Sequence, residues 1–532
     1  MGRLTRRIGI ALAVSAALTL AACSSDGGNT GSTGTASNVD KMVWGIQSPV
    51  QSMDVAKAAD VPTLRAQTAA FDRVLMIDNN GQVQPWIASK FESPDPLTLV
   101  LTLRNDVKFW DGSAMTADDV AHSISRFVGP DSTATSAYLF AAVSKVAVTD
   151  PTTVTLTLAG PDPGLPAKLA VWAQVHSKAY DDAAGEALGG PDKPGMGTGP
   201  YSITSYSSAD GAVLTRNDSY WAGKAKVKEL QFKIIGEADT ARLAISSGEI
   251  DGYFDVPLIA TRQWDELDNT TMTYTAGSYN DFLSMDTTRA PFDDVNARLA
   301  IGQLIDTNGL LGPLFNNKAT VALSTVPALQ MDATFGPDGA KKLLDAAGAP
   351  PAFSIEGAKA SLAKSKTPDG FTVDLPIDPS QPWMSPLAQH LAENAKQIGI
   401  TINVKQVSAA DWGTGLTDPN SSPLQLVALG AGTPWAGELP PVIYGSTAGF
   451  GVARYGNADV DALAGKVAVA DTVDELRQPL QDLLAASAKD LPYLPLFDEQ
   501  VATAISNKFT WEGGYTYYAL GQAWTLQVGG AG

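Results

Sequence analysis

The sequence predicts an α/β fold that divides into more than one domain. Two segments, 97–103 and 154–158, alternate apolar residues with Thr, which is the two-residue period of strands with one buried face. A third region, 371–407, has the pattern of a strand, a helix and a second strand, the βαβ unit of a parallel sheet. At 532 residues the chain is long enough for two to four domains.

The composition is that of a folded, acidic protein. Hydrophobic residues make up 44% of the chain, and 56 Asp and Glu against 37 Lys and Arg give a formal charge of −19. This balance argues against a nucleic-acid partner and against general affinity for anionic lipid, because both need clustered Lys and Arg. The single Cys excludes an intrachain disulfide and any multi-cysteine metal site.

Residues 1–22 have the layout of an export signal. A basic stretch at 3–7 precedes the apolar run 8–22, which is too short for a transmembrane helix of about 20 residues. The run closes on Leu-Ala-Ala-Cys23, which resembles a bacterial lipobox and implies a lipid on the Cys23 sulfur. We therefore expect export, by the Sec or the twin-arginine route, and a lipid anchor at the outer face of the cytoplasmic membrane, in the periplasmic or cell-envelope space.

Residues 23–39 are predicted to be a flexible tether between this anchor and the folded body. Residues 24–38 are mostly Gly, Ser, Thr and Asn, without a large apolar residue to bury. Fifteen such residues reach about 20 Å, which holds a folded body just clear of a membrane.

Helix boundaries in the body have local signals. Thr116 can cap a helix whose first turn carries two acids, which suit the positive end of the helix dipole. A second helix, near 240–247, is expected to stop at Gly248, because glycine adopts the left-handed conformation at low cost. The inward face of the first helix comprises Val120, Ile124 and Phe127.

The βαβ unit directs attention to the loops that follow its strands. Strands are expected at 371–377 and 400–407, with Ser385 as N-cap, Pro386 as the first residue of the intervening helix and Gly399 as its stop. Ligands collect beyond the carboxyl ends of parallel strands. A tryptophan follows each of these strands and the apolar run 424–429, and the three are Trp383, Trp412 and Trp435. They are expected to wall a ligand site or to pack the lobes together.

Several segments resemble, in order and spacing, the solute-binding lipoproteins of bacterial ABC importers. The segment 101–120, Leu-Thr-Leu-Arg-Asn-Asp-Val-Lys-Phe-Trp-Asp-Gly-Ser-Ala-Met-Thr-Ala-Asp-Asp-Val, is the most specific. The others are Gly-Thr-Gly-Pro-Tyr at 197–201, Arg-Asn-Asp-Ser-Tyr-Trp at 216–221, Ser-Gly-Glu-Ile-Asp at 247–251, Ala-Pro-Phe-Asp-Asp-Val at 290–295 and Tyr-Gly-Asn-Ala-Asp-Val-Asp at 455–461. The subgroup is the peptide/nickel-type family, which includes dipeptide- and oligopeptide-binding proteins.

The resemblance implies a two-lobed periplasmic-binding-protein-like fold with two crossing segments that act as a hinge. Lobe one would comprise 40–279 plus 497–532, with an extra subdomain inserted at about 85–190, and lobe two 280–496. The crossings are placed near 279–282 and 491–496. The protein would be a monomer that captures a small solute and delivers it to permease subunits driven by cytoplasmic ATPases.

The resemblance also implies a class of ligand, and a peptide-type solute is the one that it favours. Dipeptide-binding members hold the ammonium with an Asp after the strand matching 424–429, and the carboxylate with an Arg after the strand matching 371–377. Here the loop 430–435 has no acid, Glu438 being the nearest, and Gln381 stands at the Arg position. A neutral, aromatic site is therefore expected, formed by Gln47, Ser48, Tyr138, Phe140, Gln381, Trp383, Trp412, Thr433 and Trp435. Longer or end-blocked peptides fit it better than dipeptides, and a neutral oligosaccharide or a cationic or apolar small molecule is the alternative.

A metal site and an enzyme are the remaining alternatives. His122, His176 and His390 are scattered away from the expected cleft, so neither a metal nor another cofactor is expected. The segment 195–199 lacks the Lys-Ser/Thr of a phosphate loop, and neither H-E-x-x-H nor G-x-S-x-G occurs. A cell-envelope hydrolase is thus the distant alternative, and no catalytic residues are assigned.

Overall fold

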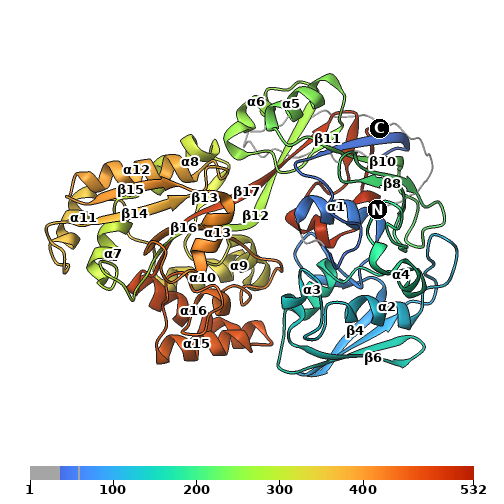
Figure 1. The fold of residues 1–532 in the computed structure, drawn as a ribbon, viewed down its shortest axis with the longest axis horizontal. Coiled ribbons are helices and arrows are strands. Elements are labelled where there is room, and N and C mark those ends of the chain that lie inside the picture. The colour runs from blue at the N-terminus through green and yellow to red at the C-terminus, as the bar shows by residue number, and fades with distance from the viewer. Residues whose placement is uncertain (1–35, 58–59) are drawn as a thin grey trace, which may run out of the picture.

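The computed structural model describes residues 36–57 and 60–532. The predicted signal, the lipidation residue Cys23 and most of the tether lie outside these residues. The described chain forms two lobes joined by two long strands (Figure 1). The first lobe contains β1 (Val39–Ile46) and the C-terminus. The second lobe contains β14 (Thr372–Ile377) and α16 (Val473–Asp490).

A nine-stranded sheet runs through both lobes, in the order β16-β12-β17-β11-β1-β10-β9-β8, with β13 paired to β17. Strand β1 pairs in parallel with β10 (Val227–Ile234) and β11 (Gly252–Tyr253), while the remaining neighbours are antiparallel. The other strands are β8 (Tyr201–Ser207), β9 (Gly211–Arg216), β12 (Thr270–Met285), β13 (Ala319–Val321), β16 (Leu424–Gly430) and β17 (Tyr493–Ser506).

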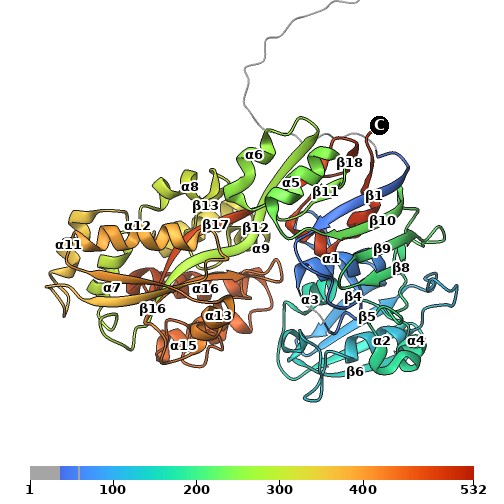
Figure 2. The same ribbon diagram turned by 45° about the horizontal axis from the view of Figure 1, so that its top comes forward.

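The two joining strands are β12 and β17. They pair antiparallel along most of their length, and the pairing slips between Ala276 and Asn280 and again between Asp281 and Phe282. On the side of the second lobe, β16 pairs with the end of β12 from Tyr279 to Met285. Both strands pass from one lobe to the other in the two views (Figures 1 and 2).

A separate four-stranded sheet, β4-β5-β7-β6, lies at the far end of the first lobe from β1 (Figure 2). Its strands are β4 (Ala88–Asp95), β5 (Thr98–Leu103), β6 (Val143–Asp150) and β7 (Thr153–Leu158). The predicted alternation is confirmed, since every second residue of β5 is buried. Helix α2 (Ala117–Ser125) begins at the predicted cap, where Thr116 and Asp119 form a reciprocal capping box.

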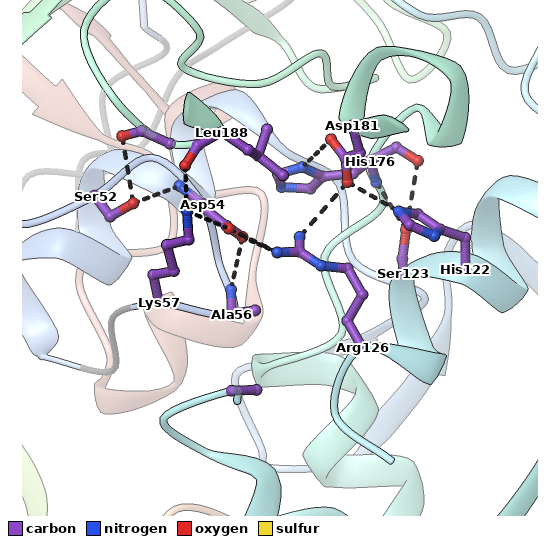
Figure 3. Close-up of polar contacts among 12 residues, drawn as sticks. Ser52, Asp54, Ala56, Lys57, His122, Ser123, Arg126, His176, Asp181 and Leu188 are labelled. Atoms are coloured by element: carbon purple, nitrogen blue, oxygen red, sulfur yellow. Dashed lines mark hydrogen bonds and ion pairs between the residues drawn. The ribbon is translucent and has the colours of Figure 1, made fainter. Parts of the chain in front are cut away.

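A polar cluster ties this sheet's helices to the rest of the first lobe (Figure 3). Arg126 contacts Asp54 at 2.6 Å and Asp181 at 3.5 Å. The Asp181 carboxylate also contacts His122 at 3.0 Å and His176 at 3.3 Å. Two of the three histidines are therefore structural partners of one buried carboxylate.

The predicted βαβ unit of the second lobe is confirmed. Strand β14 pairs in parallel with β15 (Thr401–Gln406), and α12 (Met384–Lys396) connects them. The predicted helix start is wrong, because Trp383 is the N-cap and Ser385 lies within the first turn. Burial of Met384 in the core extends the helix toward its N-terminus.

The remaining elements belong to one lobe or the other, and among them β2 with β3 and β18 with β19 form two-stranded sheets. In the first lobe they are α1 (Val61–Ala70), β2 (Leu75–Ile77), β3 (Val83–Pro85), η1 (Ala137–Phe140), α3 (Leu165–Val171), α4 (Lys178–Ala184), η2 (Gly185–Ala187), α5 (Ala238–Ser247), η3 (Leu258–Ala260), α6 (Thr261–Asp265), β18 (Phe509–Trp511), η4 (Tyr517–Gly521), η5 (Trp524–Leu526) and β19 (Val528–Gly530). In the second lobe they are α7 (Val295–Gly302), α8 (Thr307–Phe315), α9 (Ala328–Phe335), α10 (Pro337–Ala347), α11 (Ile355–Leu362), α13 (Ala409–Thr417), α14 (Pro440–Ile443) and α15 (Ala458–Ala468). Helix α5 ends at Gly248 in the left-handed conformation, as predicted.

Three apolar cores stabilise the described chain. One fills the first lobe and its extra sheet around Trp44. The second packs the βαβ unit and reaches across the joining strands to Trp264, and the third lies among α9, α10, α15 and α16. Among the described helices, none combines the length and the apolar character that a membrane span requires.

Candidate functional site

A cavity of about 610 Å³ lies where the lobes face one another. This volume falls within the range of small-molecule sites. Its lining is mostly aromatic and aliphatic, with a few polar groups. From the first lobe come Leu64, Ile77, Tyr138, Asp162, Lys168, Trp172, Tyr517 and Tyr518, from β12 comes Tyr279, and from the second lobe come Leu429 to Thr433, Trp435, Gly437 to Leu439, Pro441 and Val442.

The loop after β16 forms the wall of the second lobe. The Glu438 carboxylate folds back and accepts hydrogen bonds from the backbone N–H of Gly432 at 2.9 Å and of Thr433 at 2.8 Å, and from the Thr433 hydroxyl. Gln330 of α9 donates to the Thr433 carbonyl at 2.7 Å and to Glu438 at 3.3 Å. These bonds give the loop one shape and hold a carboxylate at the cavity.

Helix α3 and the turn before it form the opposite wall. The Lys168 ammonium binds both Asp162 carboxylate oxygens at 2.7 and 2.9 Å, and only 18% and 10% of these side chains are exposed. Trp172, one turn further along the same face, presents an indole N–H that has no acceptor among the described residues. An ion pair and a free donor therefore face the Glu438 loop.

Tyrosines of the first lobe and of β12 close the back of the cavity. The Tyr517 hydroxyl donates to the Ala431 carbonyl at 3.0 Å, which links η4 to the loop after β16. Tyr279, which is 47% exposed, lies where β12 enters the second lobe. The hydroxyl of Tyr518 is buried without a partner among the described residues.

Electrostatics of the site follow from its charged groups. Burial raises the pKa of Glu438, and the hydrogen bonds from Thr433 and Gly432 together with the Lys168 charge oppose that shift. Burial also raises the pKa of the Tyr138 hydroxyl, and the Glu438 charge adds to it. With Asp162 and Lys168 the cavity holds two carboxyl groups and one ammonium, so its lining carries charges that the neutral set of predicted residues lacks.

Three of the nine predicted site residues line this cavity: Tyr138, Thr433 and Trp435. Tyr138 is 73% exposed at the rim, and half-buried Trp435 packs its inner edge on the core of α9 and α16. The hydroxyl of Thr433 is already engaged by Glu438, so it orders the loop.

The three remaining candidates from the first lobe lie apart from the cavity lining. The Gln47 amide donates to the carbonyl of Phe254, and half-buried Ser48 follows it after β1. Phe140 is 1% exposed and packs against Phe127 in a tilted arrangement, with 5.1 Å between the ring centroids. Contact of any of them with ligand stays a prediction.

The three remaining candidates from the second lobe also lie outside the lining. Trp383 is 4% exposed in the core beneath α12. The Trp412 indole donates to the Leu426 carbonyl at 3.2 Å. Gln381 lies in the turn between β14 and α12, where its backbone N–H donates to Asp378. Ligand contact by these residues likewise stays a prediction.

The sequence interpretation gave no place in the site to Glu438, Lys168, Trp172 or Tyr517, which line the cavity. Position 438 lay outside the loop considered for an acid, and the other three carried no motif. The spacing between Thr433 and Glu438 was one signal for Glu438. A carboxylate a few residues after a Gly-Thr turn can accept hydrogen bonds from the backbone N–H groups of that turn.

The third histidine has a structural partner as well. His390 is half-buried, and its Nε2 accepts from the Asp306 N–H at 3.2 Å. In the part of the chain that the structure describes, no group of three or more His, Cys, Asp or Glu is arranged to hold a metal ion.

Curated relatives of similar length match most of the chain. The glutathione-binding protein GsiB of Pectobacterium atrosepticum is 25% identical over 503 residues, covering 90% of this chain and 93% of the relative. Its counterpart from Escherichia coli K12 is 23% identical over 506 residues, covering 88% and 91%.

Solved structures share the fold. The substrate-binding protein CtaP of Listeria monocytogenes has a TM-score of 0.80 at 18% identity, covering 93% of this chain and all of the other. The DppA protein of Helicobacter pylori, solved with the peptide STSA, has a TM-score of 0.74 at 20% identity, covering 92% and 98%. The predicted two-lobed α/β fold is thus confirmed.

The family follows from a match that spans most of the chain. The model described as "Bacterial extracellular solute-binding proteins, family 5 Middle" matches residues 82–450. This range includes five of the six segments on which the sequence resemblance rests, and that resemblance is confirmed. The chain belongs to the bacterial extracellular solute-binding proteins of family 5.

Proposed function

We propose that this protein is the lipid-anchored receptor of an ABC importer, which captures a peptide-type solute in the interlobe cavity and delivers it to permease subunits. The observation that carries this proposal is a cavity of about 610 Å³ walled by both lobes. Movement about β12 and β17 would open and close such a cavity. Capture and release involve no bond-making, and we assign no catalytic residue and no cofactor.

The division of labour within the chain is part of the proposal. Lobe one would comprise 40–279 and 497–532, with its extra subdomain at about 85–190, and lobe two 280–496. Residues 1–22 would be removed on export, and Cys23 would carry the lipid through a tether that ends at residue 39. The body would act as a monomer.

Peptide-type cargo is favoured by the relatives and by the cavity. The curated relatives bind glutathione by name, and the Helicobacter pylori protein was solved with a tetrapeptide. The cavity offers aromatic walls for side chains, a carboxylate at Glu438 for a positive group and a free indole donor at Trp172 for a carbonyl. A neutral oligosaccharide would use the aromatic walls and leave the charges unmatched.

Replacing Trp435 with Ala should weaken peptide binding by about 1–3 kcal/mol, a rise in Kd of about 5- to 150-fold, because an aromatic anchor is lost. The matched control is Trp110→Ala, which removes a half-buried indole of the first lobe outside the cavity lining. Titration calorimetry with glutathione and with a tetrapeptide measures both variants. Equal affinity of Trp435→Ala and the parent protein would remove this tryptophan from the site.

Replacing Glu438 with Gln tests the charge of the ligand. Peptides with a free ammonium should bind about tenfold or more weakly, while N-acetylated peptides should bind nearly as before, since a charge-assisted contact is lost only for the former. The variant Glu393→Gln, on the exposed surface of α12, is the control. Weakening that is equal for free and acetylated peptides would show that Glu438 only shapes the loop.

A further inference from the structure

Two carboxyl groups, those of Asp281 and Glu499, are diagonal neighbours on the two strands that join the lobes. Asp281 of β12 is 1% exposed, and neither of its carboxylate oxygens accepts a hydrogen bond from any donor among the described residues. In the register of β12 with β17, Asp281 lies opposite Phe497, so Glu499, two residues further along β17, is its diagonal neighbour, and a hydrogen bond between the two carboxyl groups would join the strands. Two carboxyl groups can form this bond only when one of them holds a proton.

The surroundings supply further negative charge, and among residues 36–57 and 60–532 no cation forms an ion pair with Asp281 or Glu499. The next residue of β17 is Asp498, which accepts from Asn280 at 2.9 Å and whose pKa burial raises to about 6. Burial raises the pKa of Asp281 well above its usual range, and Glu499 adds to the shift. Burial raises the pKa of Glu499 as well.

The charged and titratable groups on the neighbouring elements are engaged elsewhere. Lys318, before β13, pairs with Asp265 and lies over the Tyr274 ring. Arg65 of α1 pairs with Asp255 at 2.7 Å. Strand β16 carries no titratable side chain. Two further groups face this region, the Tyr279 hydroxyl on β12 and the Asp332 carboxyl on α9.

The position of the pair makes its charge relevant to movement. The pairing of β12 with β17 slips on either side of Asn280 and Asp281, so the ladder is interrupted where the chain crosses between lobes. Like charges this close in a low dielectric repel strongly, whereas a shared proton turns the repulsion into a hydrogen bond.

We propose that Asp281 and Glu499 form a proton-dependent contact between β12 and β17. When the two carboxyl groups share a proton, they hydrogen-bond and hold the two strands together; when both are ionised, they repel and the strands separate more easily. The proton comes from solvent, and no other group changes its bonding. The angle between the lobes then depends on external pH. This inference goes beyond the proposed transport role and does not require a ligand.

The direction of the pH effect follows from linkage. A carboxyl whose pKa is raised in the folded state binds its proton more tightly there than in the unfolded chain. Its contribution to stability is therefore present below the ordinary carboxyl pKa of about 4 and is lost as pH rises through the raised value. Asp281→Asn keeps the shape, can donate to Glu499 and abolishes this loss.

The test compares the protein with Asp281→Asn at pH 5 and pH 8, without added solute. We expect the radius of gyration from small-angle scattering to increase from pH 5 to pH 8 in the parent and to stay constant in the variant. The advantage of the variant in Tm should be larger at pH 8 than at pH 5 by about 2 °C or more. Asp268→Asn, a change of an exposed carboxylate just before β12, should behave as the parent.

Infrared difference spectra supply a direct readout of the proton. The carbonyl stretch of a protonated carboxyl should be present in the parent near neutral pH and absent in Asp281→Asn. Glu499→Gln should reproduce the scattering and Tm results if Asp281→Asn does not fold. An unchanged radius of gyration in the parent, or identical pH dependence in the parent and both variants, would overturn the proposal. If the parent bound no solute at any pH, that result would contradict the proposed transport role and would leave the proposed pH dependence of the lobe angle unaffected.

Discussion

Replacing Asp72 with Ala should lower the free energy of unfolding of the first lobe by about 3–5 kcal/mol, because it removes the buried carboxylate that accepts several hydrogen bonds there. Asp72 is 2% exposed. It accepts hydrogen bonds from the indoles of Trp86 and Trp221 at 2.9 and 3.0 Å, from the Thr198 hydroxyl at 2.9 Å and from the Tyr220 hydroxyl at 2.5 Å. Truncation removes the acceptor of four donors, of which the Thr198 and Tyr220 hydroxyls belong to buried residues.

Urea unfolding followed by tryptophan fluorescence and by circular dichroism measures this loss. The control Asp131→Ala changes an exposed carboxylate and should stay within about 0.5 kcal/mol of the parent. An equally small change in Asp72→Ala would mean that the four donors find other acceptors and that this carboxylate does not hold the lobe together.

Replacing Cys23 with Ala should move the exported protein almost completely from the membrane fraction to the soluble fraction. None of the described helices offers a membrane span. Under the proposed function, a lipid on Cys23 attaches the protein to the membrane, and its chains contribute about 0.8 kcal/mol for each buried methylene group. The change removes the only thiol of the chain.

Membrane sedimentation with and without detergent, together with the mass of the mature N-terminus, measures the outcome. Ser24→Ala leaves the thiol in place and should sediment as the parent does. A Cys23→Ala protein that still sediments with membranes and is released only by detergent would contradict lipid anchoring at this residue.

Features with a local cause were predictable from the sequence. The Thr alternation of β5 and β7, the cap at Thr116 and the stop at Gly248 depend on residues a few positions apart. The start of α12 was misplaced by two residues, because burial of Met384 outweighs a good capping residue at Ser385.

Features with a distant cause were not predictable. The segments 197–201 and 216–221 were recognised as family signatures. In the structure, residues of both segments donate hydrogen bonds to Asp72, which lies 126 to 149 positions earlier in the sequence. The glycines serve close packing there, since a Cβ at Gly199 would lie 2.4 Å from the Ala70 carbonyl oxygen. Nothing in a single sequence pairs these positions.

The site was predicted in part for the same reason. Three tryptophan loops were expected at one edge of a parallel sheet, but β16 pairs antiparallel with β12, whereas β14 and β15 form their own ladder. Only the loop after β16 therefore brings its tryptophan, Trp435, to the cavity, together with a carboxylate at Glu438.

The central claim is that the cavity between the lobes captures a peptide-type solute. Native mass spectrometry of the mature body, incubated with an equimolar mixture of di- to pentapeptides and neutral oligosaccharides, tests it most directly. The predicted result is one peptide retained per chain, with retention reduced in Trp435→Ala and kept in Trp110→Ala. Retention of an oligosaccharide alone, of no solute, or of peptide equally in both variants would contradict the claim.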